Sequence, residues 1–424
     1  MQNLLSYLRL AFVASCLCFA GLAMAGVTLT AKESSLGEIL PGMIANSVKV
    51  SPDSSHVAYL SKQGDKQYVV VDGKTGPAYD EIAKGNPVFS QNGQRVAYVA
   101  KQGDKWLAVV DGTPGPVYDE IGGNSFVFSP DSQHVAYKVK QGEKWLVVED
   151  GKAGTAYGSV GNPVFRPDSK GVAYVAYQGD EEFVVMDGKR MPGSAYDGIV
   201  AGDIFLSPDS KSVAYKVRQD GQRIAVKDGK LGVGYDGMGN IVFSPDSKHM
   251  AYIGQQGAKD LVVVDNKPGP AYDIVWPDIE PVFSPDSQRV AYVAQQDGKR
   301  FVIVDGKAEP AYESASKPVF SPDSQHVAYE ARENFKSFAV VDGKLDPSYE
   351  DISAPTFSPD SKRVAYAIQQ DNKKWFVQVD GVASTTAMDE IKGNIVFDTP
   401  TSLHTVAIRS KTFYRIDLTI TETK

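Results

Sequence analysis

A segment of about 40 residues recurs along nearly the whole of this sequence. The string SPDSxxVAY, or a close variant, begins at nine positions that lie 37 to 41 residues apart, namely Ser51, Ser90, Ser129, Arg166, Ser207, Ser244, Ser284, Ser321 and Ser358. A divergent tenth copy follows, because 394–397 match the residues before the motif and 406–408 match its VAY. Such a period indicates one supersecondary unit per copy, stacked on its neighbours.

Each repeat contains four apolar segments separated by turn residues. In the second copy we expect strand A at 87–89, strand B at 95–100, strand C at 106–110 and strand D at 115–121. The A–B turn is SPDS, the B–C turn is QGDK-like, and Asp-Gly follows strand C, where both residues of a tight hairpin turn accept positive φ. Four strands per 40-residue repeat predict an all-β fold, a β-propeller of about ten four-stranded blades over 26–424. Two five-bladed rings are the alternative.

The two ends of the repeat array are complementary. The tenth copy ends after its third strand, at 413–418, whereas 27–30 and 36–39 resemble a fourth strand, with 37–39 aligned on 80–82. We therefore expect the N-terminal and C-terminal segments to share one blade, which closes the ring and removes an exposed sheet edge.

The first 25 residues have the composition of a secretory signal peptide. Arg9 precedes an apolar run at 10–22, and Ala23-Met24-Ala25 is a small-residue cleavage site, so the mature chain is expected to start at Gly26. Both cysteines lie in this leader, which excludes disulfides from the mature protein. A lipoprotein-like box at 13–16 lies too close to Arg9 for us to expect lipidation. We expect a monomeric protein of the periplasm or extracellular space without an integral membrane segment.

The repeat residues resemble those of a known family. SPDS followed by two residues and VAY, with VVDG about twenty residues later, is similar to the TolB-type, WD-like β-propeller repeat of exported bacterial proteins. This resemblance implies a propeller used as a binding platform. Only 26–48 precede the first motif, so the α/β domain that TolB carries before its propeller is not expected here. No GxSxG motif of a propeller-linked hydrolase is present.

The sequence contains few motifs that indicate catalysis or the binding of a cofactor or metal. The sequence has no HExxH, P-loop, CxxC or EF-hand motif, and we expect no cofactor and no metal site. The net charge of -8 argues against a nucleic-acid partner. The SPDS residues, the strand D tyrosines and the Asp-Glu pairs recur in most copies, so we assign them to turns and packing rather than to catalysis.

Candidate binding residues lie where copies differ from one another. Strand direction alternates, so B–C turns and D–A connections share the more variable side of the ring. Four residues before each motif, where strand A begins, a polar collar is expected around the channel mouth; its proposed binding members are Asn86, Asn162, Asp203, Asn240, Glu280, Lys317 and Asn394. The longer loop at 275–279 adds Trp276 and Asp278. The simpler interpretation is that the asparagines only shape a turn.

These features favour a non-catalytic scaffold that binds a protein, peptide or glycan partner in the cell envelope. A propeller hydrolase or lyase, with active-site residues drawn from several blades at the channel mouth, is the alternative, and a purely structural or assembly role is a third. We expect Trp276, Asp278, Glu280 and Lys317 to be free of structural duty, and so available to a ligand.

Overall fold

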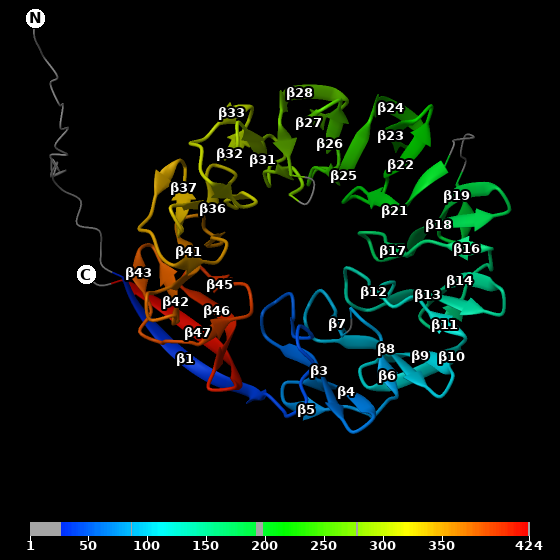
Figure 1. Ribbon diagram of the computed structural model, residues 1–424, viewed down its shortest axis with the longest axis horizontal. Helices are drawn as coiled ribbons and strands as arrows, with labels where there is room; N and C mark the ends of the chain where they lie inside the picture. Colours follow the sequence, from blue (N-terminus) through cyan, green and yellow to red (C-terminus); the bar gives the residue numbers. More distant parts are fainter. Residues whose placement is uncertain (1–26, 86, 192–197, 277–278, 423–424) are drawn as a thin grey trace, which may run out of the picture.

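The computed structural model describes residues 27–422, except 86, 192–197 and 277–278, and leaves out the side chains of 200–203. The expected signal peptide lies outside the described residues. Ten antiparallel sheets form a single ring, seen along its axis in Figure 1. The protein is thus a ten-bladed β-propeller, and the alternative of two five-bladed rings is wrong. The described residues form no helix long and apolar enough to cross a membrane.

Each blade runs outward from strand A, nearest the ring centre, to strand D at the rim (Figure 1). We number the blades 1 to 10 by their B strands. The B strands of blades 1 to 9 are β3 (Val57–Gln63), β8 (Val96–Gln102), β13 (Val135–Gln141), β18 (Val172–Gln178), β22 (Val213–Gln219), β26 (Met250–Gln256), β31 (Val290–Gln296), β36 (Val327–Glu333) and β41 (Val364–Gln369). The C strands are β4 (Lys66–Val71), β9 (Lys105–Val110), β14 (Lys144–Glu149), β19 (Glu181–Met186), β23 (Gln222–Lys227), β27 (Lys259–Val264), β32 (Lys299–Val304), β37 (Lys336–Val341) and β42 (Trp375–Val379). The D strands are β5 (Lys74–Thr75), β10 (Thr113–Tyr118), β15 (Lys152–Ala153), β20 (Lys189–Arg190), β24 (Lys230–Tyr235), β28 (Lys267–Tyr272), β33 (Lys307–Ala308), β38 (Lys344–Leu345) and β43 (Val382–Ala383).

Strand A is usually broken into two short pieces that pair with the same B strand. The first pieces are β6 (Glu81–Ile82), β11 (Glu120–Ile121), β16 (Ser159–Val160), β29 (Ile274–Val275), β34 (Ser314–Ala315) and β39 (Asp351–Ile352). The second pieces are β2 (Lys49–Val50), β7 (Val88–Phe89), β12 (Val127–Phe128), β17 (Val164–Phe165), β30 (Val282–Phe283), β35 (Val319–Phe320) and β40 (Thr356–Phe357). In blades 5 and 6 strand A is continuous but bulged, as β21 (Gly198–Leu206) and β25 (Gly237–Phe243).

The boundary between strand D and the next blade differs from the sequence prediction. Residues 115–121 were expected to form one strand, but only 113–118 belong to the outer strand β10, and Glu120–Ile121 pair with β13 of the next blade. The chain crosses between blades at this point because Asp119 bonds to the B–C turns of both. The counterpart in blade 1 is Gly42-Met43, which pairs with 61–62, so the alignment of 37–39 on 80–82 is wrong.

Blade 10 contains both ends of the chain, as predicted. Its strands are β44 (Glu390–Ile391), β45 (Val396–Thr399), β46 (Ser402–Arg409), β47 (Thr412–Glu422) and β1 (Val27–Glu38). β1 pairs with β47 from Val27 opposite Glu422 to Glu38 opposite Thr412. β1 thus covers the edge that β47 would otherwise expose.

The core lies between consecutive blades. The alanine and tyrosine of the VAY segment are almost fully buried in blades 1 to 9, because neighbouring sheets cover both faces of strand B. The strand D tyrosines pack on the VAY tyrosines of the following blade, as in Tyr79 and Tyr98, with ring centroids 6.0 Å apart. This confirms packing as their role; Tyr196 lies outside the described residues.

The SPDS turn links blades through its side chains. In blade 6, Ser244 Oγ donates to Asp246 Oδ1 at 2.6 Å and accepts the N–H of His249 at 2.9 Å. The backbone N–H of Asp246 then donates to Ser287 Oγ of blade 7 at 3.0 Å. The same bond from the third motif residue to the fourth residue of the next copy joins six further pairs: Asn92–Ser132, Asp131–Ser169, Asp168–Ser210, Asp209–Ser247, Asp286–Ser324 and Asp323–Ser361. The motif therefore forms a turn within one blade and also hydrogen-bonds that blade to the next.

We predict that deletion of residues 27–40 lowers the free energy of unfolding by several kcal/mol and causes self-association, because the edge of β47 becomes free to pair. Chemical denaturation and sedimentation should be compared with the chain that starts at residue 26. A truncated protein that stays monomeric with unchanged stability would contradict the structural role of β1.

We predict that Ser324→Ala lowers the free energy of unfolding by about 1 kcal/mol, because the N–H of Asp286 loses its acceptor, the buried hydroxyl of Ser324. Ser54→Ala is the matched control: Ser54 holds the same motif position in blade 1, but its buried hydroxyl has no hydrogen-bond partner in the described part of the chain. Equal losses in the two variants, measured by denaturant titration, would show that the bond between blades contributes little.

Candidate functional site

The candidate collar positions interrupt strand A instead of preceding it. In β25 the register shifts between Met238 and Ile241, and Asn240 lies in that bulge. In β21 the register shifts between Ile199 and Ile204, and position 203 lies within that bulge. In the remaining blades the matching residue falls between the two pieces of strand A or just before the second piece. Because strand A is the innermost strand of each blade (Figure 1), these positions lie along the inner side of the ring.

Three of the candidates form a chain across consecutive blades. Asn240 Nδ2 of blade 6 donates to Glu280 Oε1 of blade 7 at 3.0 Å, and Glu280 Oε2 lies 3.6 Å from Lys317 Nζ of blade 8. The side chains of Glu280 and Lys317 are 38% and 51% exposed, so solvent or a ligand can reach both. We call Asn240, Glu280 and Lys317 the inner arc. Sequence comparison of the copies correctly brought these residues together.

The other candidates do not extend the inner arc. Asn162 is exposed, and its Nδ2 lies 3.5 Å from the carbonyl oxygen of Asn124 in the preceding blade. Asn394 is exposed in a hollow of about 520 Å³ between blades 9 and 10. Asp203 lies on β21, but its side chain, like the whole of Asn86 and Asp278, lies outside the described residues.

At two collar positions the side chain serves the fold. Ser47 and Ser125 are buried, and each hydroxyl donates to a carbonyl three residues earlier. Each also accepts the N–H of a strand B residue, Leu60 at 3.0 Å and Lys138 at 3.1 Å. At these two positions the collar residue therefore stabilises the bend before strand B.

Trp276 has a packing role that the sequence analysis did not assign to it. Its half-buried indole packs against the core between blades 7 and 8, and the Arg300 guanidinium lies 3.9 Å from the ring centroid. The indole Nε1 is buried, and no described residue pairs with it. The expectation that Trp276 is free of structural duty is wrong.

Repeated charged residues are engaged in structural pairs. His134 Nδ1 bonds to Asp150 Oδ2 at 2.6 Å, and this bond raises the pKa of His134. On the opposite side of the ring, Asp119 pairs with Lys105 of its own blade and accepts the N–H of Gly142 in the next at 2.7 Å. Within the described residues, no group of three or more His, Cys, Asp or Glu side chains is arranged to hold a metal ion.

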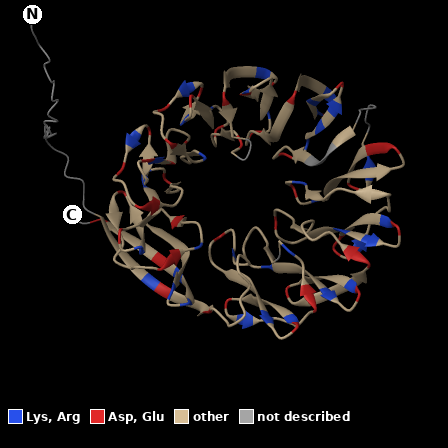
Figure 2. Ribbon diagram, in the orientation of Figure 1, with Lys and Arg blue, Asp and Glu red and all other residues tan. Residues whose placement is uncertain are grey.

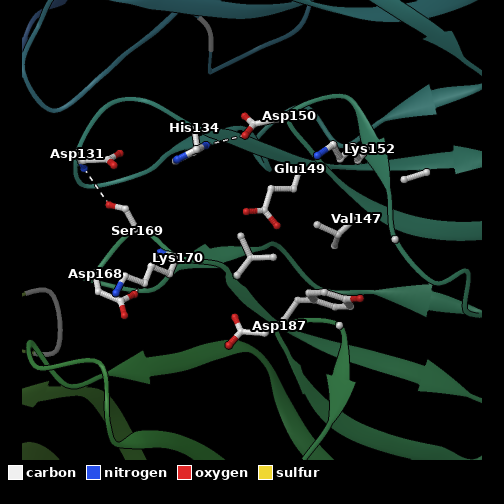
Figure 3. Close-up of a pocket in the computed structure, with 15 residues that line it drawn as sticks. Asp131, His134, Val147, Glu149, Asp150, Lys152, Asp168, Ser169, Lys170 and Asp187 are labelled. Atoms are coloured by element: carbon white, nitrogen blue, oxygen red, sulfur yellow. Dashed lines mark hydrogen bonds and ion pairs between the residues drawn. The ribbon is translucent and has the colours of Figure 1, made fainter.

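A hollow that sequence reasoning missed lies between blades 3 and 4, on the side of the SPDS turns (Figure 3). It has a volume of about 730 Å³, and Glu149 points into it between Asp150 and Val147. Most blades carry valine at the position of Glu149, so the change from VVVD to VVED was the available signal. Burial, followed by repulsion from Asp150 and Asp187, raises the pKa of Glu149.

Blade 4 also departs from the motif beside this hollow. Gly171 replaces the histidine or arginine that pairs with the Asp-Gly aspartate in most other blades, and Arg166 replaces the first serine. Arg166 takes over the pairing, with Nη1 at 2.7 Å from Asp187 and Nη2 at 2.9 Å from Asp168. A Cβ at Gly171 would lie 2.1 Å from Asp187 Oδ1, so a larger residue there would require the Asp187 side chain to move.

The chain was compared with protein families, curated proteins and solved structures. No family model matches the sequence, and no curated protein matches it. Among solved structures, a eukaryotic initiation factor is 15% identical, with 85% of this chain and 97% of that chain covered and a TM-score of 0.47. TolB from Acinetobacter baumannii is 16% identical, with 68% and 77% covered and a TM-score of 0.29. A prolyl endopeptidase structure is 15% identical, with 77% and 55% covered and a TM-score of 0.34.

We predict that Glu149→Gln raises the melting temperature at pH 7 by about 1–2 °C and has little effect at pH 4. The pKa of Glu149 in the folded chain lies above its ordinary value of 4.5, so the folded chain binds more protons between the two values. Stability therefore falls as the pH rises through that window. Thermal melts of both proteins across this range test the prediction, and a difference that does not change with pH would contradict it.

Proposed function

We propose that this protein is an exported, non-catalytic β-propeller scaffold of the TolB-type repeat family, which binds a protein, peptide or glycan partner in the periplasm or cell envelope. The signal-peptide pattern of 1–25 supports export, and the repeat motif supports the family. The observation that carries the proposal of binding is the inner arc, a charged and partly exposed chain that spans three blades of a rigid ring.

The inner arc has the features of a recognition site rather than of a repeated structural element. Other blades carry serine, alanine or asparagine at most of the matching positions, so no common structural need explains Glu280 and Lys317. Their ion pair at 3.6 Å is exposed and contributes little to stability. Polar groups held on a rigid scaffold suit specific binding, because their side chains lose little conformational freedom on association.

The distribution of charge favours a partner other than nucleic acid. Basic and acidic residues are interspersed around the ring in the part of the chain that the structure describes (Figure 2). Nucleic-acid binders instead gather basic residues into one stripe that follows the phosphates.

A propeller hydrolase or lyase is the second candidate. Glu280 could act as a general acid or base at the channel mouth, but Asn240 and Lys317 already occupy its two carboxylate oxygens. This arrangement holds charge in place and favours the scaffold.

We predict that the double variant Glu280→Ala, Lys317→Ala melts within about 1 °C of the parent, because exposed ion pairs contribute little. Binding to a partner captured from the envelope fraction of the source organism should fall by at least about tenfold. Lys248→Ala, a change of an exposed residue in an SPDS turn, is the control and should bind normally. Loss of a hydrolytic activity in the double variant, with no loss of binding, would favour the enzyme instead.

A further inference from the structure

The B–C turns of three consecutive blades depart from the rest of the ring. All ten of these turns lie within the described residues. In blades 1 to 7 each contains a glycine with positive φ, namely Gly64, Gly103, Gly142, Gly179, Gly221, Gly257 and Gly298. Blades 8, 9 and 10 have no glycine there. Their turns instead place residues with a Cβ in the left-handed conformation, which is sterically unfavourable for such residues.

Phe335 of blade 8 is the large apolar residue among them. Its φ is 62°, and it follows Asn334, whose φ is 52°, whereas blades 5 and 7 place Gly221 and Gly298 at the same position. Its side chain is 84% exposed, so no packing within the ring compensates for the disfavoured backbone. Strained residues cluster at functional sites, and an exposed aromatic face is a ready contact surface.

A polar hollow adjoins the turn that carries Phe335. The B–C connection of blade 9 has five residues between the two strands, 370–374, where the other blades have two. This longer connection borders a hollow of about 430 Å³, which is lined by Ser348, Tyr349, Glu350, Gln369, Gln370, Asp371 and Asn372. Lys336, the neighbour of Phe335, reaches into this lining: its Nζ lies 2.6 Å from Glu350 and 3.5 Å from Asp371.

We propose that the B–C turns of blades 8 and 9 form a binding site for an uncharged oligosaccharide. The apolar C–H face of a sugar ring would stack on Phe335, and its hydroxyl groups would pair with the amides and carboxylates of the hollow. The centre of a protein-binding hot spot is instead apolar and dry. An acidic sugar is disfavoured because Glu350 and Asp371 line the hollow, while the cations near them, Lys336 and Lys373, are already paired with Glu350. This site is separate from the inner arc.

The test measures binding of short glucose, galactose, mannose and N-acetylglucosamine oligosaccharides, with polyuronate fragments as the acidic comparison. We expect at least one uncharged oligosaccharide to bind the parent protein in titration calorimetry. Phe335→Gly should weaken that binding by at least about tenfold while the melting temperature stays equal or rises, because glycine relieves the left-handed backbone. The double variant Gln370→Ala, Asn372→Ala should also weaken binding of that oligosaccharide. Asp104→Ala, in the exposed B–C turn of blade 2, is the matched control.

Four results would overturn the proposal: no uncharged oligosaccharide binds, only polyuronate binds, Phe335→Gly binds normally, or Phe335→Gly loses a protein partner instead of a sugar. The Glu280→Ala, Lys317→Ala variant separates this proposal from that of the inner arc. This variant should still bind the oligosaccharide but should no longer bind the partner captured from the envelope fraction. Either proposal can therefore fail without the other.

Discussion

The ring depends on bonds and contacts between consecutive blades, because a four-stranded sheet of this size cannot bury its two faces alone. On the side of the SPDS turns, an N–H from each of seven turns donates to a serine hydroxyl of the next blade, as from Asp323 to Ser361 at 3.0 Å. On the opposite side, carboxylates such as Asp119 hold the B–C turns of two blades. Between these two belts lie the paired tyrosines and the VAY segments. Spacing between blades is therefore fixed at both ends and in the middle.

Closure of the ring uses different residues, because blade 10 has lost the SPDS motif. The buried His404 donates from Nε2 to the carbonyl oxygen of Asp53 at 2.6 Å, and Arg415 bonds to Ser55. Arg409 pairs with Glu33 across β47 and β1, with one nitrogen-oxygen distance of 2.9 Å. The hydroxyl of Ser54, which a regular preceding blade would bond, stays unpaired within the described residues. At ring closure, other contacts thus replace the repeated bond from a turn N–H to a serine hydroxyl.

This use of the repeated residues limits where recognition can occur. Most of the serines, aspartates and histidines of the motifs are bound to their own turn or to a neighbouring blade, so they offer few free groups to a ligand. Residues that break the repeat have no such duty, as Glu280 and Phe335 show. Trp276 is an exception to this rule, because its position is unique in the repeat but its ring packs on the core.

The sequence by itself determined the ten repeats, the four strands in each and the sharing of blade 10, because these follow from turn chemistry and apolar patterns that recur. It also placed Asn240, Glu280 and Lys317 on one collar, because equivalent positions in stacked blades must be neighbours. Only the tertiary structure decided that the ring is single, that Asp-Glu-Ile begins a blade instead of ending one, and that Trp276 packs inward. Only the tertiary structure also showed that Phe335 is exposed and that Glu149 points into a hollow. Each of these depends on contacts between segments of different blades, and a single repeat carries no information about the neighbour against which it packs.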